Sequence, residues 1–374
     1  MRFLSADYLF PLNVDPIKEG VIQIDKDGYI QAIFLNRNIK FKNQLEIYKG
    51  VLCPGFINSH CHLELSHLRG ISNKSKNFFD FLSIIKKRTD FSKEVIFKSI
   101  KDAESEMIKN GIVAVGDICN TTDTITQKKQ SNIQYYNFIE GYETRTENVY
   151  KKMKEIKSIR DVFRKENLQA TIVPHSFYSV TPQLMNEILN SLDTYDLVLS
   201  IHNQEIASEN NLFDNNSGKL HKWLININAS PDIWLSQNKN TLFKQNNINY
   251  ILVHNTFSRK EDIKEHYYCT CPKANLFIEG KLPNYSLFNV DKLCVGTDSL
   301  ASNNTLSILE ELKVISNNTD YDLNTLLKIS SKNGAEALRL KHFGTFEVGK
   351  KPGVNLLNIT NGILRNNTKV KVLV

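Results

Sequence analysis

The chain has 374 residues, of which 41% are hydrophobic and 23% charged, a composition typical of a globular protein with a sizeable core and not of a disordered one. Its net charge of +7 arises from 47 basic and 40 acidic residues scattered along the sequence, so no basic block predicts a nucleic-acid partner. No apolar stretch reaches the roughly 18 residues that a membrane helix needs, and the first residues lack the features of a signal peptide, so we expect no membrane partner and a cytoplasmic location.

The first 50 residues predict short β-strands joined by turns. In the stretch GVIQIDKDGYIQAIF, isoleucine and valine alternate with polar residues around an Asp-Gly turn. The tail FGTFEVGKKPGVNLLNI returns to the same β character near the other end of the chain. We expect this tail to pair with the N-terminal unit.

From Val51 onward the pattern changes to short apolar runs separated by helix-like segments. Continuous apolar runs are typical of parallel strands that are covered on both faces. The intervening segments, such as 92–110 and 147–166, carry apolar residues at three- and four-residue spacing. The eight runs are VLCPGFINSH, GIVAVGDI, IQYYNFIEG, LQATIVPHS, LVLSIHNQE, NYILVHN, YYCTCPKANLFIE and KLCVGTDS. They predict an α/β fold in which residues 51–341 form a (β/α)₈ TIM barrel.

Side chains that can bind metals or transfer protons stand at the ends of these runs. In a (β/α)₈ barrel the carboxyl ends of the strands form one rim, and active sites lie there. Residues far apart in the sequence would therefore meet at a single site. The strand-end residues are His60, His62, His175, His202, Glu205, His254 and Asp298.

The histidine pair in the first run suits a metal ion. His60 and His62 are two residues apart on an expected strand, so both side chains point to the same face. His202 and Asp298 would complete the ligand set. Neutral imidazoles and a carboxylate suit Zn²⁺ or Fe²⁺, and an ion with an open position lowers the pKa of a bound water towards neutrality.

Taken in order, these motifs resemble the amidohydrolase superfamily, in particular its metal-dependent deaminase and chlorohydrolase branch. The similarity rests on PGFINSHCHLELS, VPHSFYSVTPQL, IHNQE, ILVHN and VGTDSLASNNTLSILEEL. The resemblance implies metal binding by four residues: His60, His62, His202 and Asp298. It also implies a catalytic group of Glu205, His254 and Asp298, in which His254 orients the attacking water and Glu205 transfers its proton.

The resemblance carries expectations about the fold and the metal as well. The stretches ADYLF and FGTFEVGKKPG fit a split β-sandwich, so residues 1–50 and 342–374 are expected to form one small sandwich. Binuclear relatives typically have a carboxylated lysine at the end of the fourth strand, where this chain has His175. The expected cofactor is therefore one divalent metal per chain, Zn²⁺ in preference to Fe²⁺. Pro352 and Asn355 stand where relatives usually have an Ala-Asp pair, a departure that concerns local strand pairing only.

Further residues near the expected rim are candidates for substrate contacts. By resemblance His175 contacts the substrate, although it could instead satisfy a loop carbonyl. Arg145 could bind a carboxylate with two hydrogen bonds, and a solvated arginine is the alternative. The loop residues that either contact the substrate or pack and cap local structure are Glu64, Ser66, His67, Ser299, Ser302 and Asn303.

The stretches HCHLELS, GTDSLASN and EEL look most like the aminodeoxyfutalosine deaminases of the menaquinone route. The resemblance implies hydrolytic loss of ammonia from the adenine ring of a nucleoside with a benzoate carboxylate, which Arg69 or Arg145 would hold. Deamination of adenosylhomocysteine, methylthioadenosine or guanine, and a chlorohydrolase activity, are the enzymatic alternatives. A catalytically silent barrel used as a binding module is the non-enzymatic one. We expect a small-molecule substrate and leave a homo-oligomer open.

Overall fold

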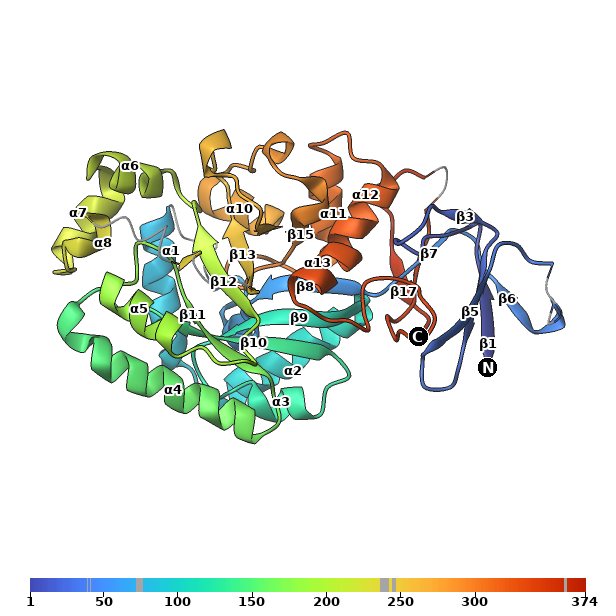
Figure 1. Ribbon diagram of the computed structural model, residues 1–374, viewed down its shortest axis with the longest axis horizontal. Helices are drawn as coiled ribbons and strands as arrows, with labels where there is room; N and C mark the ends of the chain where they lie inside the picture. Colours follow the sequence, from blue (N-terminus) through green and yellow to red (C-terminus); the bar gives the residue numbers. More distant parts are fainter. Residues whose placement is uncertain (39, 41, 72–76, 236–241, 244–246, 360–361) are drawn as a thin grey trace.

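Eight parallel strands form the centre of the larger part of the described chain (Figure 1). The computed structural model describes residues 1–374 except 39, 41, 72–76, 236–241, 244–246 and 360–361. The strands are β8 (Phe56–Cys61), β9 (Ile112–Cys119), β10 (Gln134–Gly141), β11 (Ala170–Pro174), β12 (Val198–Asn203), β13 (Asn249–His254), β14 (Tyr267–Thr270) and β15 (Leu293–Val295). Nearly all of their residues are buried, as expected for strands covered on both faces.

These strands pair in two halves that meet at both seams. One half has the order β11-β10-β9-β8 and the other has the order β12-β13-β14-β15, with parallel pairing throughout. At one seam Ser176 forms a bridge with His202, and at the other Cys61 forms a bridge with Asp298. The result is a TIM-barrel-like α/β fold whose two seams lie beside predicted site residues.

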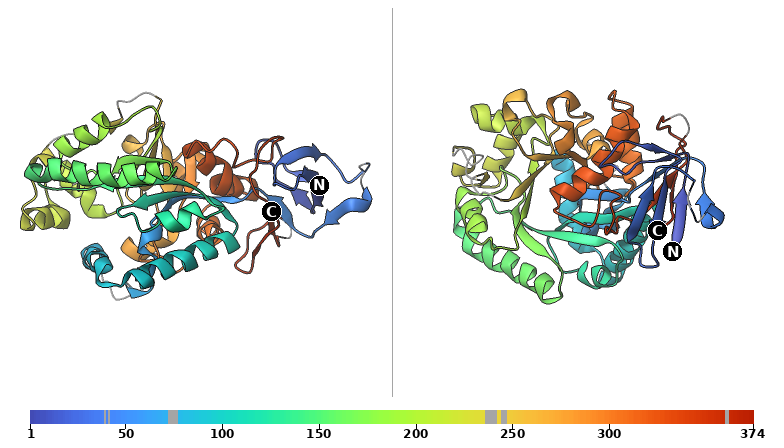
Figure 2. Two further views of the ribbon diagram at one scale, coloured as in Figure 1. Left: turned by 90° about the horizontal axis from the view of Figure 1, so that it is seen from below. Right: turned by 45° about the vertical axis from the view of Figure 1, so that its right-hand side comes forward.

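Helices pack around the strands (Figure 2, right), and their ends follow local sequence signals. In the longest segments, predicted over 92–110 and 147–166, the structure has α2 and α4. The side chain of Ser92 accepts a hydrogen bond from the Val95 N–H and so caps α2. The α-helices are α1 (Phe78–Ile85), α2 (Lys93–Lys109), α3 (Ile125–Lys129), α4 (Val149–Lys165), α5 (Pro182–Asn190), α6 (Ala207–Asn215), α7 (Gly218–Asn226), α8 (Asp232–Leu235), α10 (Pro272–Glu279), α11 (Ile308–Ser316), α12 (Leu323–Leu327) and α13 (Asn333–Ala337).

Short helical turns connect many of these elements. The segment after the first barrel strand is such a turn, η2, and it begins directly after His62. A π-helical turn, η9, joins α12 to α13. The turns are η1 (Lys42–Gln44), η2 (Leu63–Leu68), η4 (Lys86–Asp90), η5 (Thr146–Asn148), η6 (Lys260–Asp262), η7 (Tyr285–Leu287), η8 (Val290–Lys292) and η9 (Lys328–Lys332). None of the helices in the described part of the chain is long and apolar enough to cross a membrane.

Two predicted runs are not single strands. VLCPGFINSH divides into β7 (Val51–Cys53), outside the barrel strands, and β8, because Pro54 and Gly55 interrupt the pairing between them. YYCTCPKANLFIE divides into β14 and α10, because Pro272 provides the fixed φ that suits the first turn of a helix.

The two chain ends meet beside the barrel, where the blue N-terminal strands and the dark red C-terminal strands lie together (Figures 1 and 2). One sheet has the order β5-β4-β1-β6 and the other β17-β16-β7-β2-β3. A cluster of buried residues from both ends, including Leu4, Leu52 and Phe346, packs there. The strands are β1 (Arg2–Ser5), β2 (Tyr8–Leu9), β3 (Ile17–Lys18), β4 (Val21–Ile24), β5 (Ile30–Phe34), β6 (Leu45–Ile47), β7, β16 (Asn355–Leu357) and β17 (Val370–Val372). The predicted pairing of tail and N-terminal unit is present, whereas a sandwich divided from the barrel at 50 and 342 stays a prediction.

The unusual residue Asn355 has a local role in this pairing. It lies in β16 opposite Cys53 of β7. Its side-chain amide donates a hydrogen bond of 2.9 Å to the Gly111 carbonyl at the start of β9. Asn355 therefore connects the terminal sheet to the barrel while its strand keeps its partners.

Candidate active site

His60, His62 and Asp298 converge at the carboxyl ends of β8 and β15. The Nε2 atoms of His60 and His62 are 3.2 Å apart. The Asp298 Oδ1 atom lies 3.7 Å from His60 Nε2 and 3.5 Å from His62 Nε2. All three side chains are buried. Three electron-pair donors therefore face one point, which is the arrangement that a cation requires.

His202 and His254 approach the same point from the other half of the barrel. The ring centroid of His60 lies 4.9 Å from that of His202 and 6.0 Å from that of His254. Ligand nitrogens of these three residues lie within 4.8 Å of one another, as do the ligand atoms of His60, His62 and Asp298. The two groups share His60, so the predicted metal ligands occupy one continuous site.

Backbone strain accompanies this convergence. His254 has a φ of 73° and Asp298 a φ of 56°, in the left-handed region that residues other than glycine seldom adopt. Each such residue costs about 1–3 kcal/mol and persists only where surrounding contacts hold it. Here the Asp298 N–H donates a 3.1 Å hydrogen bond to the His60 carbonyl. A side chain at Gly296 would bring its Cβ to 2.7 Å from that same carbonyl oxygen, so only glycine fits there.

Hydrogen bonds orient the ligand rings. The Nδ1 atom of His202 lies 2.9 Å from the His175 carbonyl, which can only accept, so Nδ1 carries the proton and Nε2 keeps its lone pair. The Nδ1 atom of His254 lies 2.8 Å from the Asn275 Oδ1 atom and is oriented in the same way. Ser302 donates to Asp298 Oδ2, which leaves Oδ1 directed at the histidines. Such outer contacts are typical of metal-binding histidines.

The protonation states fit a divalent metal, which binds neutral imidazole and ionised carboxylate. Burial lowers the pKa of His62 to about 3 and that of His202 well below its usual value. Burial alone would raise the pKa of Asp298, but the hydrogen bond with His60 and the neighbouring imidazoles hold it well below its usual range. His62, His202 and Asp298 are therefore in the required form at neutral pH.

Glu205 stands beside this set. It follows β12 by two residues, and its Oε1 atom lies 3.6 Å from His254 Nε2. Burial raises the pKa of its carboxyl to about 7, an effect that the neighbouring His254 partly offsets. A carboxyl group with such a pKa can both accept and release a proton near neutral pH.

The candidate ligands open into a cavity of about 610 Å³. Aromatic and aliphatic side chains of α1 and α7, among them Phe78, Phe81 and Trp223, form one wall. Lys86, Arg88, Arg145 and Lys152 add positive charge to its lining. Three predicted substrate contacts line this cavity: His175, Arg145 and Ser299.

Other predicted substrate residues have local roles outside the cavity lining. Glu64 Oε2 accepts hydrogen bonds from the Asn120 and Thr121 N–H groups and so ties η2 to the loop after β9. Asn303 donates to the Thr297 carbonyl and to Glu311, which holds the turn that carries Asp298.

Three further candidates have similar structural contacts. Ser66 donates to the Leu63 carbonyl within η2. His67 bonds the Arg88 carbonyl. Arg69 pairs with Glu106 of α2. Of the two arginines expected to hold a substrate carboxylate, Arg145 lines the cavity, whereas the guanidinium of Arg69 is engaged outside the lining.

Sequence reasoning missed residues that line the cavity. Glu140 is the penultimate residue of β10 and lies beside His202, with its Oε1 atom 3.5 Å from His202 Nδ1. Its position in IQYYNFIEG, at the end of an apolar run, was a readable signal. Arg88 in η4, which lines the cavity, and Asn275 in α10, which orients His254 from outside the lining, had no such signal, because their positions depend on how turns and helices pack.

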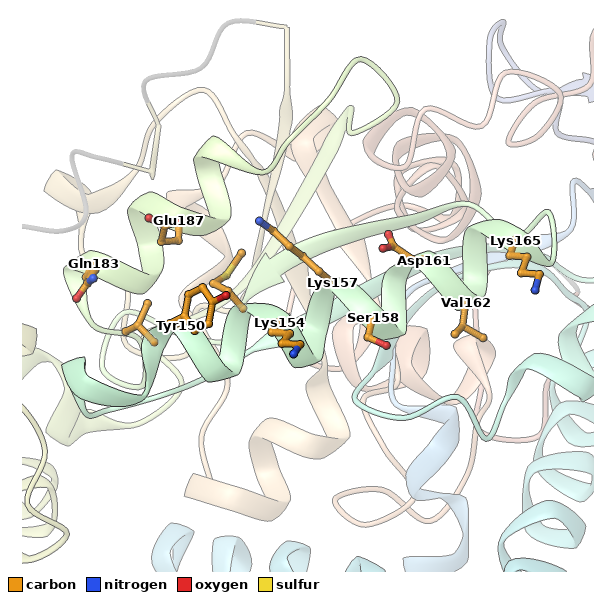
Figure 3. Close-up of a pocket in the computed structure, with 11 residues that line it drawn as sticks. Tyr150, Lys154, Lys157, Ser158, Asp161, Val162, Lys165, Gln183 and Glu187 are labelled. Carbon is orange, nitrogen blue, oxygen red and sulfur yellow. The ribbon is translucent and has the colours of Figure 1, made fainter.

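A second hollow, of about 670 Å³, lies on the outer surface formed by α4 and α5 (Figure 3). Tyr150, Lys154 and Lys157 of α4 border it, opposite Gln183 and Glu187 of α5. It contains none of the candidate metal ligands. Glu205, His254 and the candidate metal ligands His62, His202 and Asp298 line the cavity at the strand ends instead.

Comparison with known proteins agrees with this geometry. An aminodeoxyfutalosine deaminase of Nitratiruptor is 24% identical over 371 residues, covering 93% of this chain and 89% of that protein. An adenosine deaminase of Helicobacter pylori is 26% identical over 328 residues, covering 82% and 78%. The crystal structure of Helicobacter pylori aminofutalosine deaminase with methylthio-coformycin superposes with a TM-score of 0.80 at 22% identity, covering 97% and 93%. Residues 51–374 match the amidohydrolase family, and the chain therefore belongs to that family.

Proposed function

We propose that this protein is a metal-dependent hydrolytic deaminase that removes the exocyclic amine of an adenine nucleoside. The observation that carries the proposal is the position of Glu205 and His254, 3.6 Å apart, beside four convergent metal-ligand side chains and open to one cavity. Relatives named as deaminases of adenosine, aminodeoxyfutalosine and 5'-deoxyadenosine support the substrate class.

The ligand set suits one divalent cation, with Zn²⁺ preferred over Fe²⁺. His60, His62, His202 and Asp298 would hold it, and when bound it supplies Lewis acidity that lowers the pKa of a water molecule. A solved relative, an adenosine deaminase of Xanthomonas campestris, contains zinc. His175, and not a lysine, directly follows the fourth barrel strand, β11, which supports a single metal.

Glu205 and His254 would perform the proton chemistry. The Nε2 atom of His254 accepts a hydrogen bond and orients the attacking water. Glu205 takes a proton from that water and delivers it to the ring nitrogen beside the reacting carbon, so negative charge does not build up there. The remaining proton of the added hydroxyl group passes to the exocyclic amine, so that ammonia leaves as the C–N bond breaks and the carbonyl forms. Proton transfer of this kind contributes about 10²- to 10⁴-fold to the rate.

For the substrate itself we propose 6-amino-6-deoxyfutalosine, an intermediate of menaquinone biosynthesis. Its aromatic tail suits the wall formed by Phe78, Phe81 and Trp223. Its carboxylate suits the basic groups of the cavity lining, of which Arg145 and Arg88 carry planar guanidinium groups.

The test is a coupled ammonia assay on purified, metal-loaded protein. The substrates are aminodeoxyfutalosine, adenosine, adenosylhomocysteine, methylthioadenosine and guanine, with an s-triazine chloride assayed separately by chloride release. We expect the highest kcat/KM with aminodeoxyfutalosine. A higher value for another nucleoside would replace the proposed substrate and leave the deaminase proposal intact. No product from any of them, with the metal bound, would favour a catalytically silent binding module.

A further inference from the structure

Glu140 presents an unpaired acceptor to the substrate cavity. It is the penultimate residue of β10, it is only 5% exposed, and it lines the same cavity as the candidate metal ligands. One carboxylate oxygen, Oε2, accepts a 3.1 Å hydrogen bond from the Asn120 side chain. The other, Oε1, is buried and has no hydrogen-bond partner among the described residues.

The adjacent His202 ring does not donate a hydrogen bond to Glu140 Oε1. The His202 Nδ1 atom lies 3.5 Å from Glu140 Oε1, but its proton is directed to the His175 carbonyl at 2.9 Å. Arg88, which also lines the cavity, lies 3.6 Å from Glu64 and 3.5 Å from the Tyr142 hydroxyl. A buried acceptor without a donor is uncommon in native proteins, and in a ligand cavity it indicates a donor on the ligand.

The chemistry of an adenine nucleoside limits what that donor can be. The inference rests on the proposed function, in which the exocyclic amine lies beside Glu205 and the metal ligands. The ring nitrogens of adenine at positions 1, 3 and 7 are acceptors, so the base offers no second donor. The hydroxyl groups of the sugar are the remaining donors.

The placement of Glu140 agrees with a sugar contact. Glu140 Oε1 lies beside His202 Nδ1, the ring nitrogen that bonds the His175 carbonyl, and not beside Nε2, the nitrogen left available to a metal. We propose that Glu140 binds a ribose hydroxyl of the substrate and so selects ribonucleosides over deoxynucleosides and free bases.

Discrimination between ribonucleosides and deoxynucleosides follows from the free-energy cost of leaving the hydrogen bond to Glu140 unmade. A deoxynucleoside would leave the buried carboxylate oxygen unpaired, and sites built to bond a hydroxyl reject analogues that lack it. A lost charge-assisted hydrogen bond corresponds to about a 10- to 100-fold decrease in kcat/KM.

The experiment compares adenosine, 2'-deoxyadenosine and 3'-deoxyadenosine with the wild type and the variants E140A, E140Q and E143Q. For each protein kcat/KM is measured by ammonia release, and the three nucleosides are also tested as competitive inhibitors of the ribonucleoside that turns over fastest. Metal content and melting temperature establish that each variant is folded and loaded. Glu143 is the matched control, because it lines the same cavity but already accepts a hydrogen bond from the Arg145 N–H.

For the wild type we expect kcat/KM for at least one deoxynucleoside to be about 10- to 100-fold lower than kcat/KM for adenosine. E140A should reduce this ratio to within about threefold, E140Q should give an intermediate ratio, and E143Q should keep the wild-type ratio. A wild type that turns over ribose and deoxyribose nucleosides equally, or an E140A variant that keeps the wild-type ratio, would overturn the inference while leaving the deaminase intact. Absence of ammonia from every nucleoside would instead contradict the proposed function.

A contact with the base is a distinct result. If E140A lowers kcat/KM equally for all three nucleosides, and 3-deazaadenosine or 7-deazaadenosine no longer differs from adenosine in that variant, Glu140 contacts a ring nitrogen. That outcome would also overturn the sugar assignment. A sugar contact is thus recognised by the loss of discrimination against a deoxynucleoside in E140A. A base contact is recognised by the loss of discrimination against a deaza nucleoside.

Discussion

Glu205 Oε1 lies 3.6 Å from His254 Nε2, and both side chains are buried beside the metal-ligand cluster. His254 ends β13, and Glu205 follows the neighbouring parallel strand β12 by two residues; the register of the two strands places Asn203 opposite His254. The carboxyl group that we expect to transfer the proton is therefore positioned by strand pairing.

Glu205→Gln should keep the fold and the metal but lower kcat by about two to four orders of magnitude, because an amide neither accepts nor returns a proton. Steady-state ammonia release measures kcat, and elemental analysis with thermal unfolding checks metal and fold. Turnover near the wild-type value would show that another group transfers the proton.

Metal content should be close to one equivalent of Zn²⁺ or Fe²⁺ per chain, since the ligand set converges on one point. Treatment with a chelator should abolish activity and lower the melting temperature, because the metal binds the folded chain and not the unfolded one. Activity should return with one equivalent of added metal. A requirement for two equivalents would contradict the mononuclear site.

Arg145→Ala or Arg88→Ala should reduce kcat/KM for aminodeoxyfutalosine by about 10- to 100-fold, because one charge-assisted contact to the carboxylate is lost. Adenosine, which has no carboxylate, should be deaminated at nearly the same rate. Arg69→Ala is the matched control, because Arg69 pairs with Glu106 outside the cavity lining. Equal losses on both substrates would indicate a distorted site and not a lost recognition contact.

Lys128→Met should lower the free energy of unfolding by about 3–5 kcal/mol, because it leaves a buried carboxylate without its partner. Lys128 and Asp117 have fully buried side chains, and Asp117 also accepts a hydrogen bond from the N–H of Leu63, the residue after His62. Lys129→Met, which removes an ion pair of the neighbouring, half-exposed lysine, should cost less than about 1 kcal/mol. Urea unfolding of both variants gives the comparison. Equal, small effects would show that the buried pair contributes nothing to stability.

The sequence alone was sufficient for most of the barrel and for the convergence of the ligands. His60 and His62 have the two-residue spacing that places side chains on one face of a strand. His202, His254 and Asp298 follow apolar runs, and in parallel strands such positions meet at one rim. These features are local in the sequence, because a few neighbouring residues set both the alternating direction of side chains along a strand and the residue at which the strand ends.

Other features depended on the tertiary structure. The division of the first run into β7 and β8, the engagement of Arg69 with Glu106, and the unpaired oxygen of Glu140 all result from contacts between segments distant in the sequence. Arg88 enters the cavity only because η4 packs beside the barrel rim. The sequence determined which residues can bind a metal and transfer a proton, since that follows from side-chain chemistry and strand periodicity. The tertiary structure decided which remaining side chains reach the substrate, since long-range packing determines whether a polar group is satisfied by the protein or left for a ligand.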